Sequence, residues 1–405
     1  MHCIRKVTDD LWWVGANDRR TPLFENVHPI PRGVSYNSYL LLDEKTVLFD
    51  CVDWSAAPRL VENVEHLLNG RELDYIVLHH LEPDHGAGLW AVLQRWPGAT
   101  LISSLAAQRF MDQFGFAPIQ AQRITAKEGE RFSFGRHAVT FYAAPMVHWP
   151  DVMVSFEETD GVLFSADAFG VFGALNGKLF QDELDFPHDW LGEARRYYAN
   201  IVGKYGPQVQ ALLAKLTALE GRLKLLCPLH GPVWRSDLDW FIEKYDRWSK
   251  YQPEDHGVLL VYGSMYGGTE AAAEALATAL TERGVETSMY DVSTTHVSQL
   301  IAESFRCSHI VLASVTYNMD FYPPMRDFLE DMRALGLKGR TFAVMENGTW
   351  NPAAGKLIEA FVTGQLEDCA LLESRVTMKS TLKGEQAGEL EALAEAIAHS
   401  VKREA

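Results

Sequence analysis

The second half of the chain shows a regular alternation of short apolar runs and amphipathic stretches. Apolar runs typical of buried strands occur at 258–264, 286–292, 309–315 and 340–346. Stretches with apolar residues at helical spacing occur at 269–284, 325–336 and 389–403. When helices cover both faces of a sheet, each strand is buried on both sides and its sequence is a continuous apolar run. This half is therefore predicted to form a doubly wound parallel sheet of the α/β class.

The first half has a different pattern. Short runs rich in strand-forming residues, at 35–50 and 137–167, are separated by polar turns, with a helical stretch at 56–68 between them. This pattern predicts an α+β arrangement in which strands pack into sheets with helices outside. Residues 245–257 run from a helical pattern into Pro, Asp and Gly, which indicates a boundary. The predicted domains are 1–250 and 257–405.

Composition narrows the class of protein. With 405 residues and 47% hydrophobic content, the chain is long enough for two globular domains. A formal net charge of −17 disfavours nucleic acid as a partner, because phosphate backbones require a basic surface. The first residues lack the apolar segment of a secretory signal, and no apolar run approaches the length of a membrane span. We therefore expect a soluble cytoplasmic protein that binds neither nucleic acid nor membrane.

Cysteine usage agrees with that location. The cysteines are odd in number, widely dispersed and without a C-x-x-C pair; they are Cys3, Cys51, Cys227, Cys307 and Cys369. This usage is typical of reduced thiols in a cytosol. It also indicates that no rubredoxin-like or zinc-ribbon module is built into this sequence.

The stretch HHLEPDHGAG, residues 79–88, places three histidines and two carboxylates directly after an apolar run. Alternate residues of an extended loop point the same way, so His80, Glu82 and Asp84 are expected to converge. His85 is expected to turn to the other side of a shared centre. One such loop can serve two metal ions, although a solvated polar loop explains it equally well when it is taken alone.

Three other apolar runs each end in one potential ligand: His148, Asp167 and His230. Each alone is more often an ordinary polar strand end, but four such loops together favour ligands that meet at one edge of a sheet sandwich. Seven ligands exceed the need of one ion and a carboxylate can bridge two, so a dinuclear centre is predicted, with Asp167 as the bridging candidate. His79 is interpreted as a solvated flanking residue without a metal role. The candidate ligands are His80, Glu82, Asp84, His85, His148, Asp167 and His230.

In the second half, VYGSMYGGTE joins the first predicted strand to the first predicted helix. Its hydroxyls and backbone N–H groups at a helix N-terminus favour a phosphate. It lacks the Lys-Ser/Thr ending of a nucleotide-triphosphate loop and the G-x-G-x-x-G of a dinucleotide fold. Two later loops, 314–325 and 346–355, fall at carboxyl ends of later strands, where such sheets bind ligands.

These residues carry two family resemblances. The first half resembles the metallo-β-lactamase fold, an αββα sandwich whose hydrolases usually carry H-x-H-x-D-H and bind zinc. Glu82 stands where their second histidine stands, and a carboxylate moves preference from zinc toward iron. The H-x-E-x-D-H form, followed by HWPD (148–151), DAFG (167–170) and LHG (229–231), is similar to the flavodiiron proteins.

The three loops of the second half resemble those of flavodoxins, which bind FMN. Tyr317 and Trp350 are expected to flank the isoalloxazine ring, although aromatics that merely cover a surface pocket are the alternative. Two departures from the family pattern are Gly268, where many relatives have Asn, and Val315, where many have Pro. The expected FMN contacts are Ser264, Met265, Tyr266, Gly267, Gly268, Thr269, Thr316, Tyr317, Asn318, Asn347, Gly348, Thr349 and Trp350.

The resemblance to flavodiiron proteins implies two irons per chain. One takes His80, Glu82 and His148, the other takes Asp84, His85 and His230, and Asp167 bridges them. It further implies reduction of dioxygen to water, of nitric oxide to nitrous oxide, or both. The implied partners are rubredoxin or its reductase as electron donor, with reduced deazaflavin coenzyme as the alternative, and a second copy in a head-to-tail homodimer or dimer of dimers.

Two rival functions remain open at this level. A zinc-dependent hydrolase with an appended flavodoxin domain is disfavoured by Glu82 and has no use for a flavin. A pure electron carrier, with the first half as a docking scaffold, is disfavoured by the intact set of seven ligands. The sequence does not rank dioxygen against nitric oxide, because that preference depends on contacts around the ligands.

Overall fold

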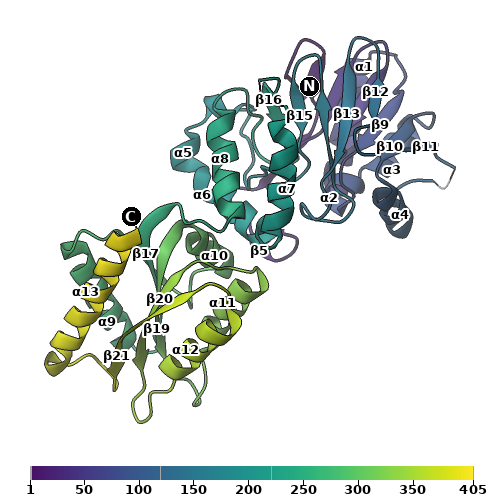
Figure 1. Ribbon diagram of the computed structural model, residues 1–405. Coiled ribbons are helices and arrows are strands. Elements are labelled where there is room, and N and C mark those ends of the chain that lie inside the picture. Colours follow the sequence, from purple (N-terminus) through teal and green to yellow (C-terminus); the bar gives the residue numbers. More distant parts are fainter. Residues whose placement is uncertain (1, 119, 220, 405) are drawn as a thin grey trace. The chain divides into compact units, whose positions relative to one another are not determined.

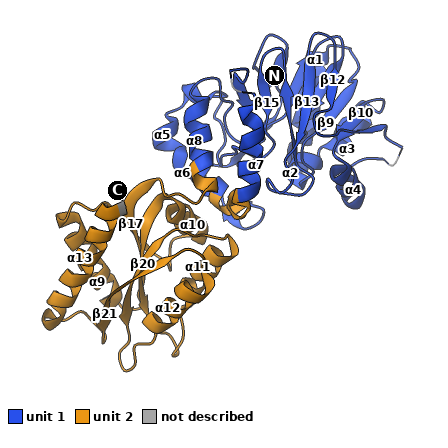
Figure 2. Ribbon diagram, in the orientation of Figure 1, with its two compact units in different colours: residues 1–198, 207–246 blue, residues 199–206, 247–405 orange. Residues whose placement is uncertain are grey.

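The computed structural model describes residues 2–118, 120–219 and 221–404. The chain forms two compact units, blue and orange in Figure 2. In both units helices flank central strands, as Figure 1 shows. The first unit comprises residues 1–198 and 207–246, and the second comprises 199–206 and 247–405.

The first unit contains a seven-stranded sheet in the order β1-β2-β7-β8-β9-β10-β11. Its strands are β1 (Arg5–Lys6), β2 (Leu11–Trp13), β7 (Tyr39–Leu42), β8 (Thr46–Phe49), β9 (Tyr75–Leu78), β10 (Thr100–Ser103) and β11 (Arg123–Thr125). Strands β8 to β11 pair in parallel, and a parallel pair requires a crossover connection. The crossovers contain α1 (Ala57–Leu68), α2 (Pro83–Gly86), α3 (Leu89–Arg95) and α4 (Leu105–Phe114).

Helix α1 illustrates why these residues form their elements. Leu60, Val64 and Leu68 recur every four residues and are buried on one face of the helix. Pro58 lies in the first turn, where its missing N–H costs nothing. The helix ends at Asn69, which adopts the left-handed conformation of a C-cap.

The second sheet of this unit contains five strands in the order β12-β13-β14-β15-β16. They are β12 (Arg131–Ser133), β13 (Ala138–Ala143), β14 (Met153–Glu157), β15 (Val162–Phe164) and β16 (Leu225–Cys227). The two sheets pack face to face: Phe49 of β8 stacks on Phe164 of β15 with ring centroids 4.0 Å apart, and both are buried. Further helices complete the predicted αββα sandwich: α5 (Phe186–Asp189), α6 (Leu191–Tyr197), α7 (Gly206–Thr217) and α8 (Leu238–Ser249).

Two short hairpins and several single turns complete the unit and its connection to the next. β3 (Ala16–Asp18) pairs with β6 (Val34–Tyr36), and β4 (Leu23–Phe24) pairs with β5 (His28–Pro29). The turns are η1 (Trp54–Ala56), η2 (Gln181–Glu183), the π-helical η3 (Tyr198–Val202) and η4 (Gly203–Tyr205).

The second unit is the predicted doubly wound sheet, and all of its five strands are parallel, in the order β18-β17-β19-β20-β21. They are β17 (Asp255–Gly263), β18 (Thr287–Asp291), β19 (Cys307–Val315), β20 (Thr341–Asn347) and β21 (Ala370–Met378). Its helices are α9 (Gly268–Glu282), α10 (Val297–Arg306), α11 (Pro323–Ala334), α12 (Ala354–Gln365), the turn η5 (Gly384–Gln386) and α13 (Ala387–Glu404).

The core of the second unit follows from alternation along these strands. Val258 and Leu260 of β17 and Val311 and Ala313 of β19 point to one face, and they pack with buried residues of α9 and α13. Figure 1 shows α10, α11 and α12 on the other side of the sheet. The ligand-binding edge of such a sheet is the carboxyl end of its strands, where β17, β19, β20 and β21 all terminate.

One charged side chain lies in the interior of the second unit. Arg340 is 1% exposed, and its guanidinium donates hydrogen bonds to backbone carbonyls. The acceptors include Tyr251 at 2.5 Å, Ser304 at 2.8 Å and Phe305 at 3.0 Å. Arg340 therefore ties Tyr251, which precedes β17, to the end of α10.

The cysteines differ in accessibility. Cys51, Cys227 and Cys307 are buried, Cys369 is half-buried, and Cys3 is exposed. Burial raises the pKa of the Cys51 and Cys227 thiols well above the ordinary value. Among the described residues, every helix is too short or too polar to span a lipid bilayer.

Candidate metal centre and flavin cavity

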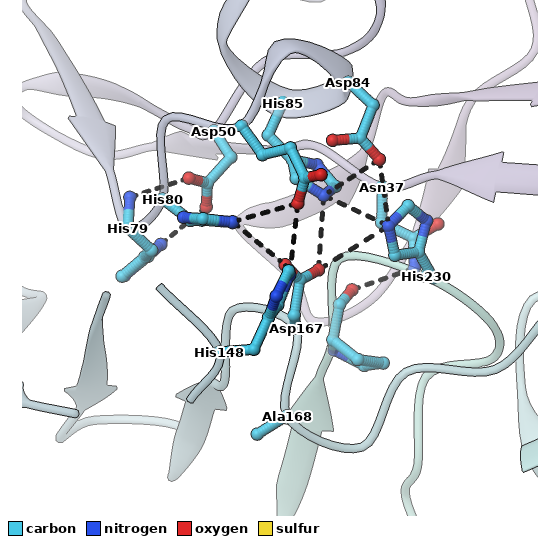
Figure 3. Close-up of polar contacts among 12 residues, drawn as sticks. Asn37, Asp50, His79, His80, Asp84, His85, His148, Asp167, Ala168 and His230 are labelled. Atoms are coloured by element: carbon cyan, nitrogen blue, oxygen red, sulfur yellow. Dashed lines mark hydrogen bonds and ion pairs between the residues drawn. The ribbon is translucent and has the colours of Figure 1, made fainter. Parts of the chain in front are cut away.

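Four loops bring the candidate metal ligands to one edge of the sandwich, as Figure 3 shows. The loop after β9 carries the ligands between positions 80 and 85. The loops after β13, β15 and β16 carry His148, Asp167 and His230. Each loop starts at a strand end, so the sheets hold its position. All seven candidate ligands converge in two adjacent groups.

The first group contains His80, Glu82, His148 and one oxygen of Asp167. Nε2 of His80 lies 3.3 Å from Oε2 of Glu82 and 3.3 Å from Oδ2 of Asp167. Nε2 of His148 lies 3.1 Å from the same Glu82 oxygen and 3.4 Å from the same Asp167 oxygen. The four ligand atoms thus face a common centre.

The second group contains Asp84, His85 and His230, and it faces the other oxygen of Asp167. Nε2 of His85 and Nε2 of His230 are 3.1 Å apart and lie 3.4 Å and 3.2 Å from Oδ2 of Asp84. Oδ1 of Asp167 is 3.2 Å from His85 and 3.5 Å from His230. Asp167 therefore presents one carboxylate oxygen to each group, which is the geometry of a bridging ligand.

The arrangement of Asp84 differs from the spacing argument. Alternation predicted that Asp84 would join His80 and Glu82, and this prediction is wrong. Pro83 begins the short helix α2, because proline suits a first helical turn. The extended alternation ends at Glu82, and the helical turn directs Asp84 and His85 to the second group.

Several observations indicate that both groups suit metal ions. Both oxygens of Asp84 and both oxygens of Asp167 are buried and accept no hydrogen bond from the described residues, although a buried carboxylate needs a positive partner. Ligand atoms about 2.1 Å from one shared cation stand about 3.0–3.4 Å apart, close to the separations in both groups. Four imidazoles and three carboxylates form the mixed nitrogen and oxygen set that iron accepts.

The groups also shift one another's pKa values. Burial alone lowers the pKa of His148, but the nearby Asp167 carboxylate and the contact with Glu82 outweigh it and raise the pKa to about 9. Burial also lowers the pKa of His85, and the charges of Asp84 and Asp167 raise it to about 9. Burial raises the pKa of Asp167, but the charge of His85 and the close approach of the His148 and His85 imidazoles hold it well below the usual range. The bridging candidate is therefore ionised.

Outer contacts orient the histidines. Nδ1 of His80 lies 3.2 Å from Oδ1 of Asp151, and Oδ2 of Asp151 accepts a hydrogen bond from the backbone N–H of Leu81. Nδ1 of His230 donates to the carbonyl of Ser35 at 2.7 Å. In both cases an Nδ1–H donor leaves Nε2 as the lone-pair atom that faces the centre. Asp151 and Ser35 were not predicted, because their contacts depend on packing between distant segments.

His79 is not a solvated flanking residue. Its exposed fraction is 0%, and both ring nitrogens have partners. Nδ1 lies 2.5 Å from Oδ2 of Asp50, and Nε2 lies 2.7 Å from the hydroxyl of Ser155. It belongs to neither ligand group.

A small cavity of about 270 Å³ opens onto Glu82 and Asp84. Leu23 and Phe24 of the β4–β5 hairpin give it apolar walls, and Tyr36 also lines it. Its remaining lining residues are Thr21, Glu25, Asp53 and Pro83. Sequence analysis did not find this hairpin, because nothing in its composition marks it as part of a site. Trp149 of the HWPD motif is outside the lining of this cavity and packs edge-on against the His80 ring with centroids 5.1 Å apart.

A second cavity, of about 860 Å³, lies at the carboxyl edge of the parallel sheet. The β17–α9 loop and the loop after β20 supply most of it, through residues 264–269 and 347–350. All ten of these residues were predicted flavin contacts. Tyr266 and Trp350 border the cavity and are 96% and 81% exposed.

The loop after β19 contributes less than predicted. Val315 lines the cavity, whereas Thr316, Tyr317 and Asn318 are outside its lining. The Thr316 hydroxyl instead accepts hydrogen bonds from the N–H groups of Ala353 and Ala354, at 2.8 Å and 3.0 Å. The structure adds three lining residues that sequence analysis missed: Ala271, Ser380 and Thr381.

Family models match both halves of the chain. The ODP family beta lactamase model matches residues 34–231, and the flavodoxin model matches residues 260–366. The fold and the two sites thus define a class of proteins that join a lactamase-like metal sandwich to a flavodoxin-like unit. The names of individual relatives identify which family within this class the chain belongs to.

The chain is 30% identical to a nitric oxide reductase of Moorella thermoacetica over 87% of this chain and 88% of that protein. It is 29% identical to a rubredoxin-oxygen oxidoreductase of Megalodesulfovibrio gigas over 98% of both chains. Among solved structures, the flavodiiron protein of Giardia intestinalis superposes with a TM-score of 0.92 at 26% identity, covering 99% of this chain and 98% of that one. The chain belongs to the flavodiiron proteins.

Proposed function

We propose that this protein is a flavodiiron oxidoreductase that reduces dioxygen to water, nitric oxide to nitrous oxide, or both. The observation that carries the proposal is Asp167, whose two buried oxygens each face a separate group of ligands. A flavin-sized cavity in the same chain supports a redox rather than a hydrolytic use of that centre. The names of the Moorella and Megalodesulfovibrio relatives support both gases as substrates.

In this proposal three ligands bind each iron, and a seventh binds both. His80, Glu82 and His148 hold one iron, and Asp84, His85 and His230 hold the other, with Asp167 bridging them. When bound, a pair of irons and FMN supply together the electrons that multi-electron reduction of a diatomic gas requires.

The protein side chains orient the ligands and limit access to the centre. Asp151 and the Ser35 carbonyl fix the ring orientation of His80 and His230. The apolar walls from Leu23 and Phe24 restrict the 270 Å³ cavity to small molecules and reduce its hydration. Dioxygen and nitric oxide are small and apolar enough to enter such a space.

The flavin assignment uses two loops. Residues 264–269 offer backbone N–H groups and hydroxyls at the N-terminus of α9, which suits the phosphate of FMN. Asn347, Gly348 and Thr349 offer polar groups to the ring edge, with Tyr266 and Trp350 beside it. We keep Thr316, Tyr317 and Asn318 as proposed contacts, which require the loop after β19 to adjust around the ring.

Partners and location are part of the same proposal. A rubredoxin or its reductase supplies electrons, as the name of the Megalodesulfovibrio relative supports for that protein. Exposed apolar residues border the flavin cavity at Tyr266 and Trp350, and the exposed Trp54 directly follows Asp53, which lines the cavity at the metal groups. A head-to-tail homodimer in the cytoplasm would cover both sets and bring each flavin to the partner's metal centre.

The decisive experiment measures metal content and gas turnover of anaerobically purified protein. We expect two irons and one FMN per chain, and consumption of dioxygen or nitric oxide with chemically reduced rubredoxin. Two zinc ions without iron would favour the hydrolase instead.

A matched pair of variants tests the role of Asp167. Asp167→Ala should abolish gas consumption, because it removes the only side chain among the seven ligands that faces both groups. Asp160→Ala, at the turn before the same strand β15, is the control and should retain activity. Undiminished turnover by Asp167→Ala would favour the pure electron carrier.

A further inference from the structure

Asp50 and His79, which Figure 3 shows beside the metal groups, form a chain of three buried polar side chains with Ser155. Asp50 follows β8, His79 follows β9, and Ser155 lies within β14. All three are at most 1% exposed. Oδ2 of Asp50 lies 2.5 Å from Nδ1 of His79, and the Ser155 hydroxyl lies 2.7 Å from Nε2, so both ring nitrogens are within hydrogen-bond distance of a partner.

His79 connects the two sheets at the edge that carries the ligands. Its side chain reaches Ser155 of the second sheet, and its carbonyl accepts a hydrogen bond from the N–H of Met153 at 3.0 Å. On the side of the first sheet, Asp50 holds both its ring and its backbone N–H, the latter at 2.7 Å. The start of β14 is therefore fixed against the end of β9 through one residue.

This connection joins the two loops of the first ligand group. His80 follows His79 directly, and His148 lies on the loop that leads into Met153 at the start of β14. The His80 ring and the Leu81 N–H both contact Asp151 of that second loop. The separation between His80 and His148 therefore depends on how β14 sits against β9.

The second ligand group has anchors of its own. The carbonyl of His85 accepts a hydrogen bond from the N–H of Cys51 at 3.2 Å. Nδ1 of His230 is bound to Ser35, and the N–H of the next residue, Gly231, donates to the Ser35 hydroxyl at 2.8 Å. None of these contacts passes through the ring of His79.

We propose that His79 is a positioning residue for the metal centre, which acts by holding β14 against β9 and thereby sets the geometry of the first ligand group. The inference rests on the proposed diiron function. It predicts an asymmetric effect: loss of the His79 hydrogen bonds weakens retention of the iron at His80, Glu82 and His148 and spares the other iron.

Two variants of the full-length protein, reconstituted anaerobically with ferrous iron and FMN, test this. His79→Phe keeps an aromatic ring beside Phe49 and Phe164, whose ring centroids lie 6.2 Å and 6.0 Å from that of His79, but it removes both hydrogen bonds. Ser155→Ala removes only the bond to Nε2 and leaves the Asp50–His79 pair in place. Release of iron to a chelator is followed with time, and FMN content is measured in parallel.

The matched control is His137→Phe. His137 is also 1% exposed, and it lies at the opposite end of the sandwich. Its ring lies 2.9 Å from Glu157 of β14 and 3.1 Å from Asp10, which directly precedes β2 of the first sheet, so it too connects the two sheets. Removing it imposes a similar loss of buried hydrogen bonds without touching the ligand loops.

In the wild-type protein both irons should leave slowly. In His79→Phe one of the two irons should leave at least about tenfold faster, the scale on which outer contacts of metal ligands act. Ser155→Ala should give the same biphasic release with a smaller factor, and His137→Phe should match the wild type. Retained FMN in all variants would confirm that the flavodoxin-like unit is unaffected.

Three outcomes would overturn the inference. These are unchanged release from His79→Phe and Ser155→Ala, equal acceleration of both irons, and equal acceleration in His137→Phe. Failure of the proposed function looks different, because wild-type protein would then retain no iron at all. If His79→Phe did not fold, the outcome for Ser155→Ala would decide alone.

Discussion

Glu82 places one carboxylate oxygen 3.3 Å from Nε2 of His80 and 3.1 Å from Nε2 of His148. The two histidines supply neutral nitrogen donors, so Glu82 adds the negative charge that distinguishes this group from a histidine-only set. Hard oxygen donors favour iron, whereas a site richer in imidazole suits zinc. The metal preference of the first group is therefore expected to depend on this one side chain.

We expect Glu82→His to raise the proportion of zinc that the protein binds. The measurement is metal content after reconstitution with equal amounts of ferrous iron and zinc under anaerobic conditions. Glu44→His is the control, because it adds the same imidazole at an exposed position that belongs to neither ligand group. An unchanged ratio of zinc to iron in Glu82→His would show that Glu82 does not set the preference.

Single residues also show what a sequence can reveal. The convergence of the seven proposed ligands was predictable because each lies in a loop that follows an apolar run, and strand ends meet at a sheet edge. The partners of His79 were not predictable, since Asp50 and Ser155 lie 29 and 76 residues away and only packing brings them together. Alternation alone placed Asp84 with the wrong group because it ignored the helical turn that Pro83 begins, whereas the family resemblance placed Asp84 with His85 and His230.

At the scale of elements, the flavin cavity depends on a close approach of two loops. A Cβ atom on Gly268, at the start of α9, would lie 2.1 Å from the carbonyl oxygen of Ser380 in the loop after β21. Only glycine allows this approach, because a backbone atom cannot move aside as a flexible side chain can. Gly268 is thus explained where flavodoxins often have Asn: here the β21 loop occupies the space.

We expect Gly268→Ala to weaken FMN binding at least about tenfold, equivalent to about 1.4 kcal/mol, because the two loops must separate. Titration with FMN, followed by quenching of its fluorescence, measures the change. Gly364→Ala in α12 is the control, since its Cβ would meet nothing within 4 Å. Equal affinity in Gly268→Ala and wild type would contradict the role of this contact.

Elements differed in how readily they could be predicted. The buried strands β17, β19 and β20 are continuous apolar runs, so their pattern was clear. Strand β21 lies at the edge of the sheet and is largely exposed or half-buried, so no such run marks it. Ser380 and Thr381, in the loop that follows it, were missed as cavity lining for the same reason.

At the scale of the whole molecule, we propose that residues 1–250 and 257–405 fold as separate domains. Each compact unit has its own sheets, and the two proposed cofactors bind in different units. Segment 199–206 belongs with the second unit, where the Tyr251 hydroxyl donates to the Gly203 carbonyl at 2.9 Å. Sequence analysis did not predict that segment 199–206 packs with the second unit, because no local sequence pattern indicates it.

Denaturant unfolding should therefore show two transitions that respond to different ligands. FMN at about one hundred times its Kd should stabilise only the flavodoxin-like transition, by about 2.7 kcal/mol. Removal of iron by a chelator should destabilise only the other transition. Flavin fluorescence and far-UV circular dichroism distinguish the two, and one transition that both ligands shift equally would contradict separate folding.

The burial of Cys51, Cys227 and Cys307 has a consequence for a protein that handles reactive gases. Nitrosation and sulfenic acid formation both begin at an accessible thiolate; all three thiols are buried, and burial raises the pKa of Cys51 and Cys227. Damage is thereby confined to Cys3 and Cys369, far in sequence from every proposed ligand. We therefore expect the three buried thiols to remain unmodified over many turnovers of dioxygen or nitric oxide.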